Sequence, residues 1–545
     1  MVGFRVRGSR SAGRFCPGIL LLSGGAAGAA GFGQNPVMPA YGLFSADQFV
    51  TTTGSCLDCG ALPQALWYFR NETIAVPKPG MPVAGFDPNL PVRKDLAAWA
   101  QRTPVTAVAE LPPLIWQAAP DTLHKVQLAD DGRGISVGDQ QLALQLAPQL
   151  PLNSAWFDAS SKAFFHGRPL KLRGNRQGET FVARNFWPQD FSIPETPAAG
   201  ALNDDPGAIR DWVRTQPPSR ADSPFVVQSV WRRPDNSGPR AGQPVIGLML
   251  NGAQGDDDEA HGGHFALMTG HIGENGGIDD WLVNNFYTLD SESEKGIIAA
   301  PVPLDNYLGD LNSGQAWYRP SYLLVATLAD ARSAARLQSA LGRVYNQFYR
   351  HQFAYQHARA NCAGISVNTV RTLGWQVPAR GPESWPKAIV ALPLVAVKEG
   401  SLTKGKATFD YLTEDRTILY PVVAFEEMGA DLLRLASSEG GRTLSEFEKL
   451  LAADITEILL VRVPQFPSSR AWGDWPVESS VEYEARVPSN PADQKIIPVP
   501  PRPFPDELRD PRSPAEPWLR SDYAVVAWGL VIVALIMFIL RRLLA

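Results

Sequence analysis

Cysteine is scarce in this chain, whose 545 residues include only four. This scarcity excludes a disulfide-rich secreted scaffold. It also excludes a zinc site built from two Cys-x-x-Cys pairs, because only Cys56 and Cys59 have that spacing. These two residues predict a local disulfide, with a redox pair as the alternative. Cys16 lies near the start of the chain, and Cys362 stands far from the other three in the sequence.

The chain also lacks an excess of basic residues and any internal repeat. Its formal net charge is −5, and no basic stripe is visible, which argues against nucleic acid as a partner. Forty-seven prolines and 47 glycines indicate many turns and short strands rather than a helical bundle. With 45% hydrophobic residues, the chain is long enough for two or three domains with substantial cores.

Long apolar runs are absent except for one near the C-terminus, Tyr523 to Leu540, which Arg541 and Arg542 follow directly. An uncharged run of this length predicts a single transmembrane helix. The two arginines favour a cytoplasmic C-terminus and therefore place the bulk of the chain on the other side of the membrane.

The N-terminal residues 1–34 have features of an export signal, with a basic stretch, a short apolar core at Ile19 to Leu22 and small residues after it. The sequence therefore predicts a protein of the bacterial inner membrane whose bulk is periplasmic. The alternative is a tail-anchored protein that faces the cytoplasm.

Turn-rich and apolar segments alternate along the chain and predict an α+β fold with several regions. Ten of the 30 residues from Pro488 to Pro517 are proline, which is typical of a stiff, extended linker. Apolar residues at helical spacing predict a helix within Leu432 to Ile458. The predicted parts are a signal segment 1–34, a β-rich region 35–240, an α+β core 241–394, a small mixed domain 395–487, a proline-rich stalk 488–520 and a transmembrane helix 523–540.

Three strands are predicted at the start of the core. Residues 245–250 and 264–271 are apolar on both faces, as in buried strands. Asn275 and Gly276 signal a tight turn, after which residues 281–287 return antiparallel. Side chains alternate between the faces of a strand, so a connection of even length places His264 and Asn285 on one face. His271 and Asn284 then share the other face.

A short helix is predicted to begin at Cys362. Asn361 is a favourable N-cap residue, and Gly374 is a favourable residue just beyond the C-terminal end. Cys362 would lie in the first turn, where the helix dipole lowers the pKa of a thiol. Arg359 nearby would add to this effect.

A thiolate at a helix start beside a His–Asn pair resembles the papain-like thiol hydrolases. The order of elements, with histidine strands before the cysteine helix, is similar to the circularly permuted branch, which includes lecithin:retinol acyltransferase-like enzymes and bacterial cell-wall hydrolases. The resemblance covers residues 244–375. It implies a papain-like core in which Cys362 is the nucleophile, His264 the base and Asn285 the orienting residue, with His271 as the alternative third residue.

That resemblance implies a cysteine-dependent peptidase, amidase or acyltransferase that needs no cofactor and acts on a cell-wall peptide or a lipid. Other interpretations stand beside it. Cys362 by itself is also consistent with a small, buried hydrophobic residue. His264 is also consistent with a residue that only makes a hydrogen bond at the edge of a strand.

Two further hypotheses come from other residues. The acidic loop from Asp256 to His264 contains carboxylates and imidazoles that would suit a divalent metal ion, although its ligand order is not that of an EF-hand. Its candidate ligands are Asp256, Asp258, Glu259, His261 and His264. The aromatic segments 185–188 and 317–320 would suit a non-catalytic envelope scaffold that binds peptide or glycan, or a hydrophobic core.

Overall fold

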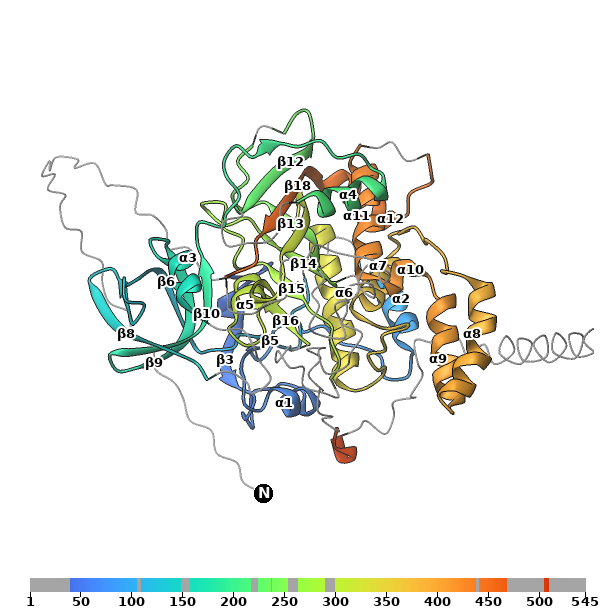
Figure 1. Ribbon diagram of the computed structural model, residues 1–545, viewed down its shortest axis with the longest axis horizontal. Coiled ribbons are helices and arrows are strands. Elements are labelled where there is room, and N and C mark those ends of the chain that lie inside the picture. Colours follow the sequence, from blue (N-terminus) through green and yellow to red (C-terminus); the bar gives the residue numbers. More distant parts are fainter. Residues whose placement is uncertain are drawn as a thin grey trace, which may run out of the picture. The chain divides into compact units, whose positions relative to one another are not determined.

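The structure is a computed structural model. It describes residues 40–104, 109–148, 157–216, 224–236, 238–252, 263–289, 299–437, 441–467 and 504–508. All of them belong to one compact unit, Pro39–Ala545. Figure 1 shows its strands and helices.

An eight-stranded sheet forms the centre of the described residues. Its strands pair in the order β11-β12-β18-β17-β13-β14-β15-β16, and every pair except β11 with β12 is antiparallel. The bounds are β11 Ala198–Ala199, β12 Val226–Arg232, β18 Ile455–Val463, β17 Ser321–Leu328, β13 Pro244–Asn251, β14 His264–His271, β15 Leu282–Asn284 and β16 Pro301–Pro303. Every residue of β17 and β18 is buried, as expected for central strands that are covered on both faces.

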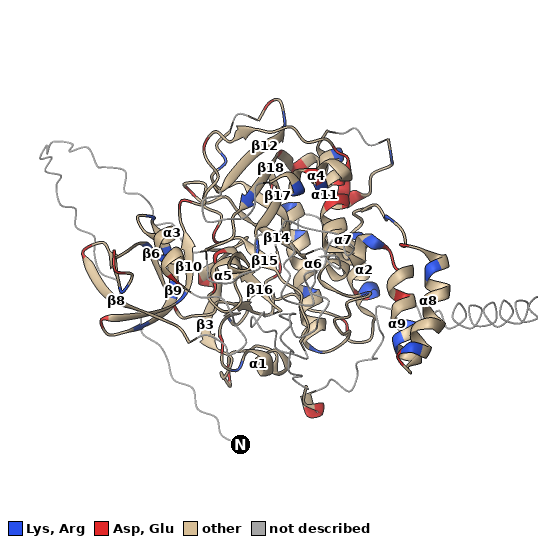
Figure 2. Ribbon diagram, in the orientation of Figure 1, with Lys and Arg blue, Asp and Glu red and all other residues tan. Residues whose placement is uncertain are grey.

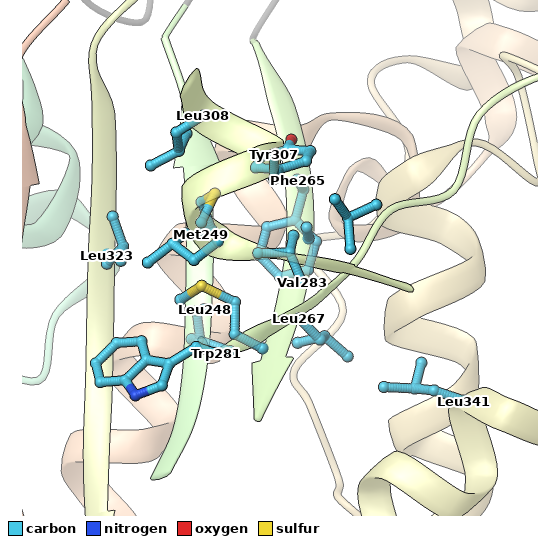
Figure 3. Packing of buried hydrophobic residues seen from close by; sticks show 14 of the residues in the cluster. Leu248, Met249, Phe265, Leu267, Trp281, Val283, Tyr307, Leu308, Leu323 and Leu341 are labelled. Carbon is cyan, nitrogen blue, oxygen red and sulfur yellow. The ribbon is translucent and has the colours of Figure 1, made fainter. Parts of the chain in front are cut away.

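Three helices pack against β13 and β14: α6 (Arg332–Tyr349), α7 (Cys362–Leu373) and α11 (Pro421–Ser437). Phe265 and Leu267 of β14 and Leu341 of α6 belong to the core that these elements share, as Figure 3 shows. The remaining helices of this part are α2 Val92–Arg102, α4 Pro206–Thr215, α5 Leu304–Gly309, α8 Trp385–Lys398, α9 Leu402–Thr413, α10 Arg416–Leu419 and α12 Glu446–Asp454.

A closed five-stranded barrel, in the order β10-β8-β7-β6-β9, lies earlier in the chain. Its strands are β6 Asp121–Leu128, β7 Gly134–Val137, β8 Gln140–Leu146, β9 Leu170–Gln177 and β10 Thr180–Pro188, with helix α3 at Ala159–Phe165. Smaller elements precede it. They are β1 Ala40–Tyr41, β2 Phe44–Ser45, β3 Phe49–Thr53, α1 Pro63–Phe69, β4 Thr73–Pro77 and β5 Ile115–Trp116.

The fold predicted from the sequence was wrong in its membrane component. Among the residues that the structure describes, no helix is both long and apolar enough to cross a bilayer. The longest, α6, spans 18 residues but carries three arginines, and α11 carries Glu426, Glu427 and Asp431. The segment Tyr523 to Leu540 itself lies outside the described residues, as do residues 1–34.

The structure adds detail to three of the predicted ranges. The region predicted as β-rich contains four helices, α1 to α4, besides its twelve strands, β1 to β12. The helical pattern expected up to Ile458 ends earlier, because α12 stops at Asp454 and β18 begins at Ile455. Within the range predicted as a stalk, Phe504 is buried and stacks on Tyr68 of α1.

A buried charge cluster joins the barrel to the central sheet. Lys171 of β9 donates to Asp279 and Asp280 at 2.7 Å each, and Arg173 donates to Asp305 at 2.7 and 3.0 Å. Burial acts to lower the pKa of Lys171, but the neighbouring carboxylates outweigh it and hold that pKa above its ordinary value. The cluster therefore stays charged inside the protein.

We expect Asp305→Asn to destabilise the protein by about 3–5 kcal/mol, since it leaves the buried Arg173 guanidinium without its carboxylate. Denaturant unfolding measures this. Asp330→Asn is the matched control, because its half-exposed ion pair with Arg332 should change the unfolding free energy by less than about 1 kcal/mol. Equal effects of the two substitutions on the free energy of unfolding would contradict the conclusion that the buried charge cluster holds the barrel to the central sheet.

Candidate functional site

The helix that begins at Cys362 has the ends predicted from the sequence. The Asn361 side chain accepts a hydrogen bond from the Gly364 N–H at 2.8 Å, which caps the first turn. It also donates to the carbonyl of Leu419 at 2.7 Å and so ties the cap to α10. Gly374 follows the last turn with φ 106°, a conformation that favours glycine. Cys362 is therefore the first residue of α7.

Cys362 is a buried, reduced cysteine with 3% of its surface exposed. Its backbone N–H donates to the hydroxyl oxygen of Tyr355 at 3.4 Å, and its carbonyl accepts from Ser366 at 2.8 Å. The Tyr355 ring lies against Tyr287, with centroids 5.7 Å apart. This contact connects the start of α7 with the chain that follows β15.

His264 is the first residue of β14, and its position depends on the glycine before it. A Cβ at Gly263 would lie 2.0 Å from the carbonyl oxygen of Asn251, and the φ of Gly263 is +76°. Only glycine fits both the close approach and this backbone conformation. His264 itself is buried.

His264 and Asn285 are in direct contact. The Nε2–H of His264 donates to Oδ1 of Asn285 at 2.7 Å. The register explains the contact: Leu267 of β14 pairs with Asn284 of β15, so Asn285 lies opposite Ala266 and on the same face as His264. This hydrogen bond fixes the proton on Nε2 and makes Nδ1 the nitrogen that can accept a proton.

Asn285 is in turn held by α6. Its carbonyl accepts from the Tyr345 hydroxyl at 2.8 Å, and Phe286 stacks on the Tyr345 ring with centroids 4.3 Å apart. Burial raises the pKa of Tyr345 well above its ordinary value of 10.0, so the hydroxyl stays a donor at neutral pH. Sequence reasoning missed Tyr345 and Tyr355; Tyr345 lies one residue after the core position Val344, and nothing in the sequence signalled Tyr355.

The alternative third residue, His271, is at the other end of β14. Its Nδ1 contacts the carbonyl of Gly42 at 3.3 Å. Asn284 belongs to a separate buried network with Gln338 of α6 at 3.0 Å. The structure therefore places Asn285, and not His271, beside His264.

The metal hypothesis involves residues of which most lie outside the described part: Asp256, Asp258, Glu259 and His261. Within the described part, no group of three or more His, Cys, Asp or Glu side chains is arranged to hold a metal ion. The fifth candidate, His264, contacts Asn285.

The aromatic segments considered for ligand binding are in the core. Trp187 and Trp317 are buried and pack with Phe466 at centroid distances of 6.5 and 5.3 Å. Arg359, which was expected to favour the Cys362 thiolate, forms an ion pair with Asp410 and approaches Glu414 at 4.0 Å. These two carboxylates offset its charge.

Cys56 and Cys59 form a disulfide with an S–S distance of 2.03 Å. A cavity of about 270 Å³ opens beside this loop, lined among others by Cys59, Lys78 and Asn346. None of its lining residues belongs to the group around Cys362 and His264.

Comparison of the chain with protein-family models, curated proteins and solved structures finds no match in any of the three. The papain-like relationship thus stays a prediction, and the site has to be argued from its own residues.

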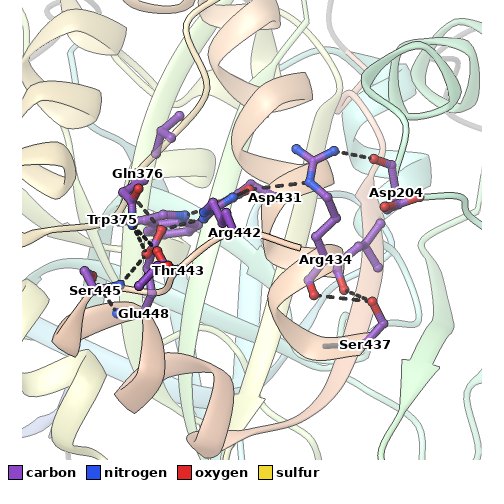
Figure 4. A network of polar contacts seen from close by, with 12 residues as sticks. Asp204, Trp375, Gln376, Asp431, Arg434, Ser437, Arg442, Thr443, Ser445 and Glu448 are labelled. Carbon is purple, nitrogen blue, oxygen red and sulfur yellow. Dashed lines mark hydrogen bonds and ion pairs between the residues drawn. The ribbon is translucent and has the colours of Figure 1, made fainter. Parts of the chain in front are cut away.

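A polar network secures the far end of α7, as Figure 4 shows. Trp375 Nε1 donates to Asp431 of α11 at 2.8 Å, and Arg442 donates to the same carboxylate at 2.9 Å. The backbone N–H of Gln376 donates to Glu448 of α12 at 2.8 Å. The loop after α7 is therefore fixed to two neighbouring helices.

Glu448 makes this network sensitive to acid. Burial acts to raise the pKa of Glu448, but hydrogen bonds from Ser445, Gln376 and Arg442 outweigh it and hold that pKa below its ordinary value of 4.5. A lowered pKa in the folded state stabilises the protein above pH 4.5, and this contribution is lost as the pH falls through the folded value.

We expect Glu448→Gln to lower the free energy of unfolding by about 1 kcal/mol at pH 7, a value reduced for partial solvent screening. The difference from wild type should shrink below pH 4.5, which denaturant unfolding at several pH values measures. Glu446→Gln is the control, since this exposed carboxylate pairs only with Lys449 among the described contacts. A difference independent of pH would contradict the role of ionised Glu448.

Proposed function

We propose that this protein is a cysteine hydrolase or acyltransferase that cleaves amide or ester bonds through a thioester on Cys362. His264 is the general base and acid, and Asn285 orients its ring. The observation that carries the proposal is the buried hydrogen bond from His264 Nε2 to Asn285 Oδ1. It lies on β14, the strand against which the cysteine helix packs.

The hydrogen bond to Asn285 satisfies the buried imidazole of His264 and also fixes the orientation of its ring. Asn285 is also held through its backbone carbonyl by the Tyr345 hydroxyl of α6. The bond selects the tautomer that carries its proton on Nε2. A base oriented by a third group, on a strand that packs against the helix carrying the candidate nucleophile, fits the general pattern of nucleophilic catalysis.

The nucleophile is supported by its position. Cys362 is the first residue of a 12-residue helix, and the partial positive charge of a helix N-terminus favours a thiolate. Its burial strengthens this electrostatic effect, while desolvation by itself acts against the thiolate.

In the proposed reaction, His264 Nδ1 accepts the thiol proton and the sulfur attacks the carbonyl carbon of the substrate. The tetrahedral adduct collapses, the C–N or C–O bond breaks, and His264 returns the proton to the leaving amine or alcohol. Water, activated by His264, then hydrolyses the thioester to an acid. If an amine or alcohol attacks instead, the acyl group is transferred.

The cellular setting is a separate matter. The predicted export signal and the periplasmic location rest on residues outside the described part and stay predictions. A cell-wall peptide or a lipid ester remains the proposed substrate class, as the sequence resemblance implies.

The first test is the rate of Cys362 alkylation by iodoacetamide as a function of pH. We expect an apparent pKa well below the value of about 8.5 for an ordinary thiol. His264→Ala should slow the reaction at neutral pH by tenfold or more, because the imidazolium partner of the thiolate is lost. His271→Ala, on the same strand, is the matched control and should react like wild type.

A second readout concerns acyl transfer itself. Incubation with p-nitrophenyl acetate should place an acetyl group on Cys362, detectable by peptide mass spectrometry, and Cys362→Ser should abolish the adduct on the thiol. Labelling of Cys362 only after unfolding, with no acetyl adduct, would make it a core residue. The non-catalytic scaffold would then be the better interpretation.

A further inference from the structure

The hairpin of α8 and α9 exposes an apolar stripe to solvent. Of the ten large hydrophobic side chains that are exposed among the described residues, five lie between positions 385 and 402. They are Trp385 (47% exposed), Val390 (64%), Leu394 (65%), Val397 (83%) and Leu402 (61%). We call these five residues the α8 stripe.

Three of the five residues form a continuous face of α8, while Trp385 and Leu402 are the first residues of α8 and α9. Val390, Leu394 and Val397 follow at spacings of four and three, which places them on the same side of α8. The opposite side is used within the hairpin, where Ala388 and Leu392 pack on Phe409 of α9 in a small core of their own. The α8 stripe therefore points away from the protein, and its exposure is not explained by the fold.

The charges around the stripe indicate what could cover it. No acidic residue occurs between Trp385 and Lys398, and lysines stand at both ends, Lys387 and Lys398. Lys404 adds a third cation in the first turns of α9. Figure 2 shows blue basic positions at both ends of this hairpin. Lys387 and Lys404 pair with Glu383 and Glu399, but these contacts are exposed and contribute little.

We propose that the α8 stripe docks on an anionic lipid surface, with α8 lying in the plane of the interface. An apolar helix face flanked by lysines and a tryptophan is the pattern of interfacial helices, in which apolar side chains enter the acyl boundary and lysines reach the headgroups. The fit is electrostatic as well as apolar, because the flanking cations complement anionic lipids.

A second copy of the chain fits the stripe less well. A two-fold pairing of two α8 helices would bring Lys387 of one copy near both Lys398 and Glu399 of the other, so the charges at the helix ends give such pairing no net attraction. Stable protein interfaces use roughly 20–30 residues on each partner, whereas the stripe supplies five.

Hydrogen exchange of residues 385–402 in the full chain tests the proposal, because this readout reports on the hairpin whatever the rest of the chain does. Phosphatidylglycerol-containing vesicles should slow exchange in this segment, and pure phosphatidylcholine vesicles should do so much less. Leu394→Glu should abolish the protection. Val50→Glu, at another exposed apolar position, is the matched control and should leave it intact.

Lys387→Gln combined with Lys398→Gln gives a variant whose apolar stripe is unchanged. Its affinity for the anionic vesicles should fall by at least about tenfold, from the loss of two cations near the surface. If exchange of residues 385–402 slows with rising protein concentration in the absence of lipid, the occupant of the α8 stripe is a second copy of the chain. Protection without lipid that disappears on removal of residues 509–545 would identify a segment of the chain itself. Either result, or no protection at all, overturns the proposal.

Discussion

The antiparallel register of β13, β14 and β15 is the constraint on which the candidate site depends. Asn251 pairs with His264 at the end of β13, and Leu267 pairs with Asn284 in β15. A shift of one residue in the pairing of β14 with β15 would turn His264 and Asn285 to opposite faces. The register of β13 and β14 is protected because both faces of these strands are buried, so a slip would disrupt the close packing of side chains on each face. The close approach of Gly263 to Asn251 fixes the pairing of β13 with β14 at the end of the strands where His264 lies.

Much of this local geometry was predictable from the sequence. The apolar strands, the turn at Asn275 and Gly276 and the parity argument correctly place His264 and Asn285 on one face. The N-cap at Asn361 and the glycine after α7 correctly bound the cysteine helix. Such features depend on neighbours within a few residues, and the sequence records them directly through periodicity, capping and turn chemistry.

Features that depend on distant partners were not predictable. The central sheet takes β12 and β18 from sequence ranges that were expected to form separate parts, and the range of the predicted helix overlapped the first residues of β18, from Ile455 to Ile458. Arg359 forms an ion pair with Asp410, which is distant from it in the sequence. Tyr345 and Tyr355 act on the site only because α6 and the loop after it fold back over β15 and α7. Periodicity carries no information on such pairings.

The two proposals meet at the start of α7. Asn361 caps this helix and donates to Leu419 of α10, and α10 begins three residues after the end of α9. Arg359, three residues before Cys362, pairs with Asp410 of α9. The hairpin that carries the α8 stripe is therefore fastened to the chain beside the nucleophile through short polar contacts rather than through a flexible linker. A surface bound by the stripe would be held at a fixed orientation to Cys362. Such coupling suits an enzyme whose ester or amide substrate is itself anchored in a lipid layer, since docking then orients the site before any substrate contact is made.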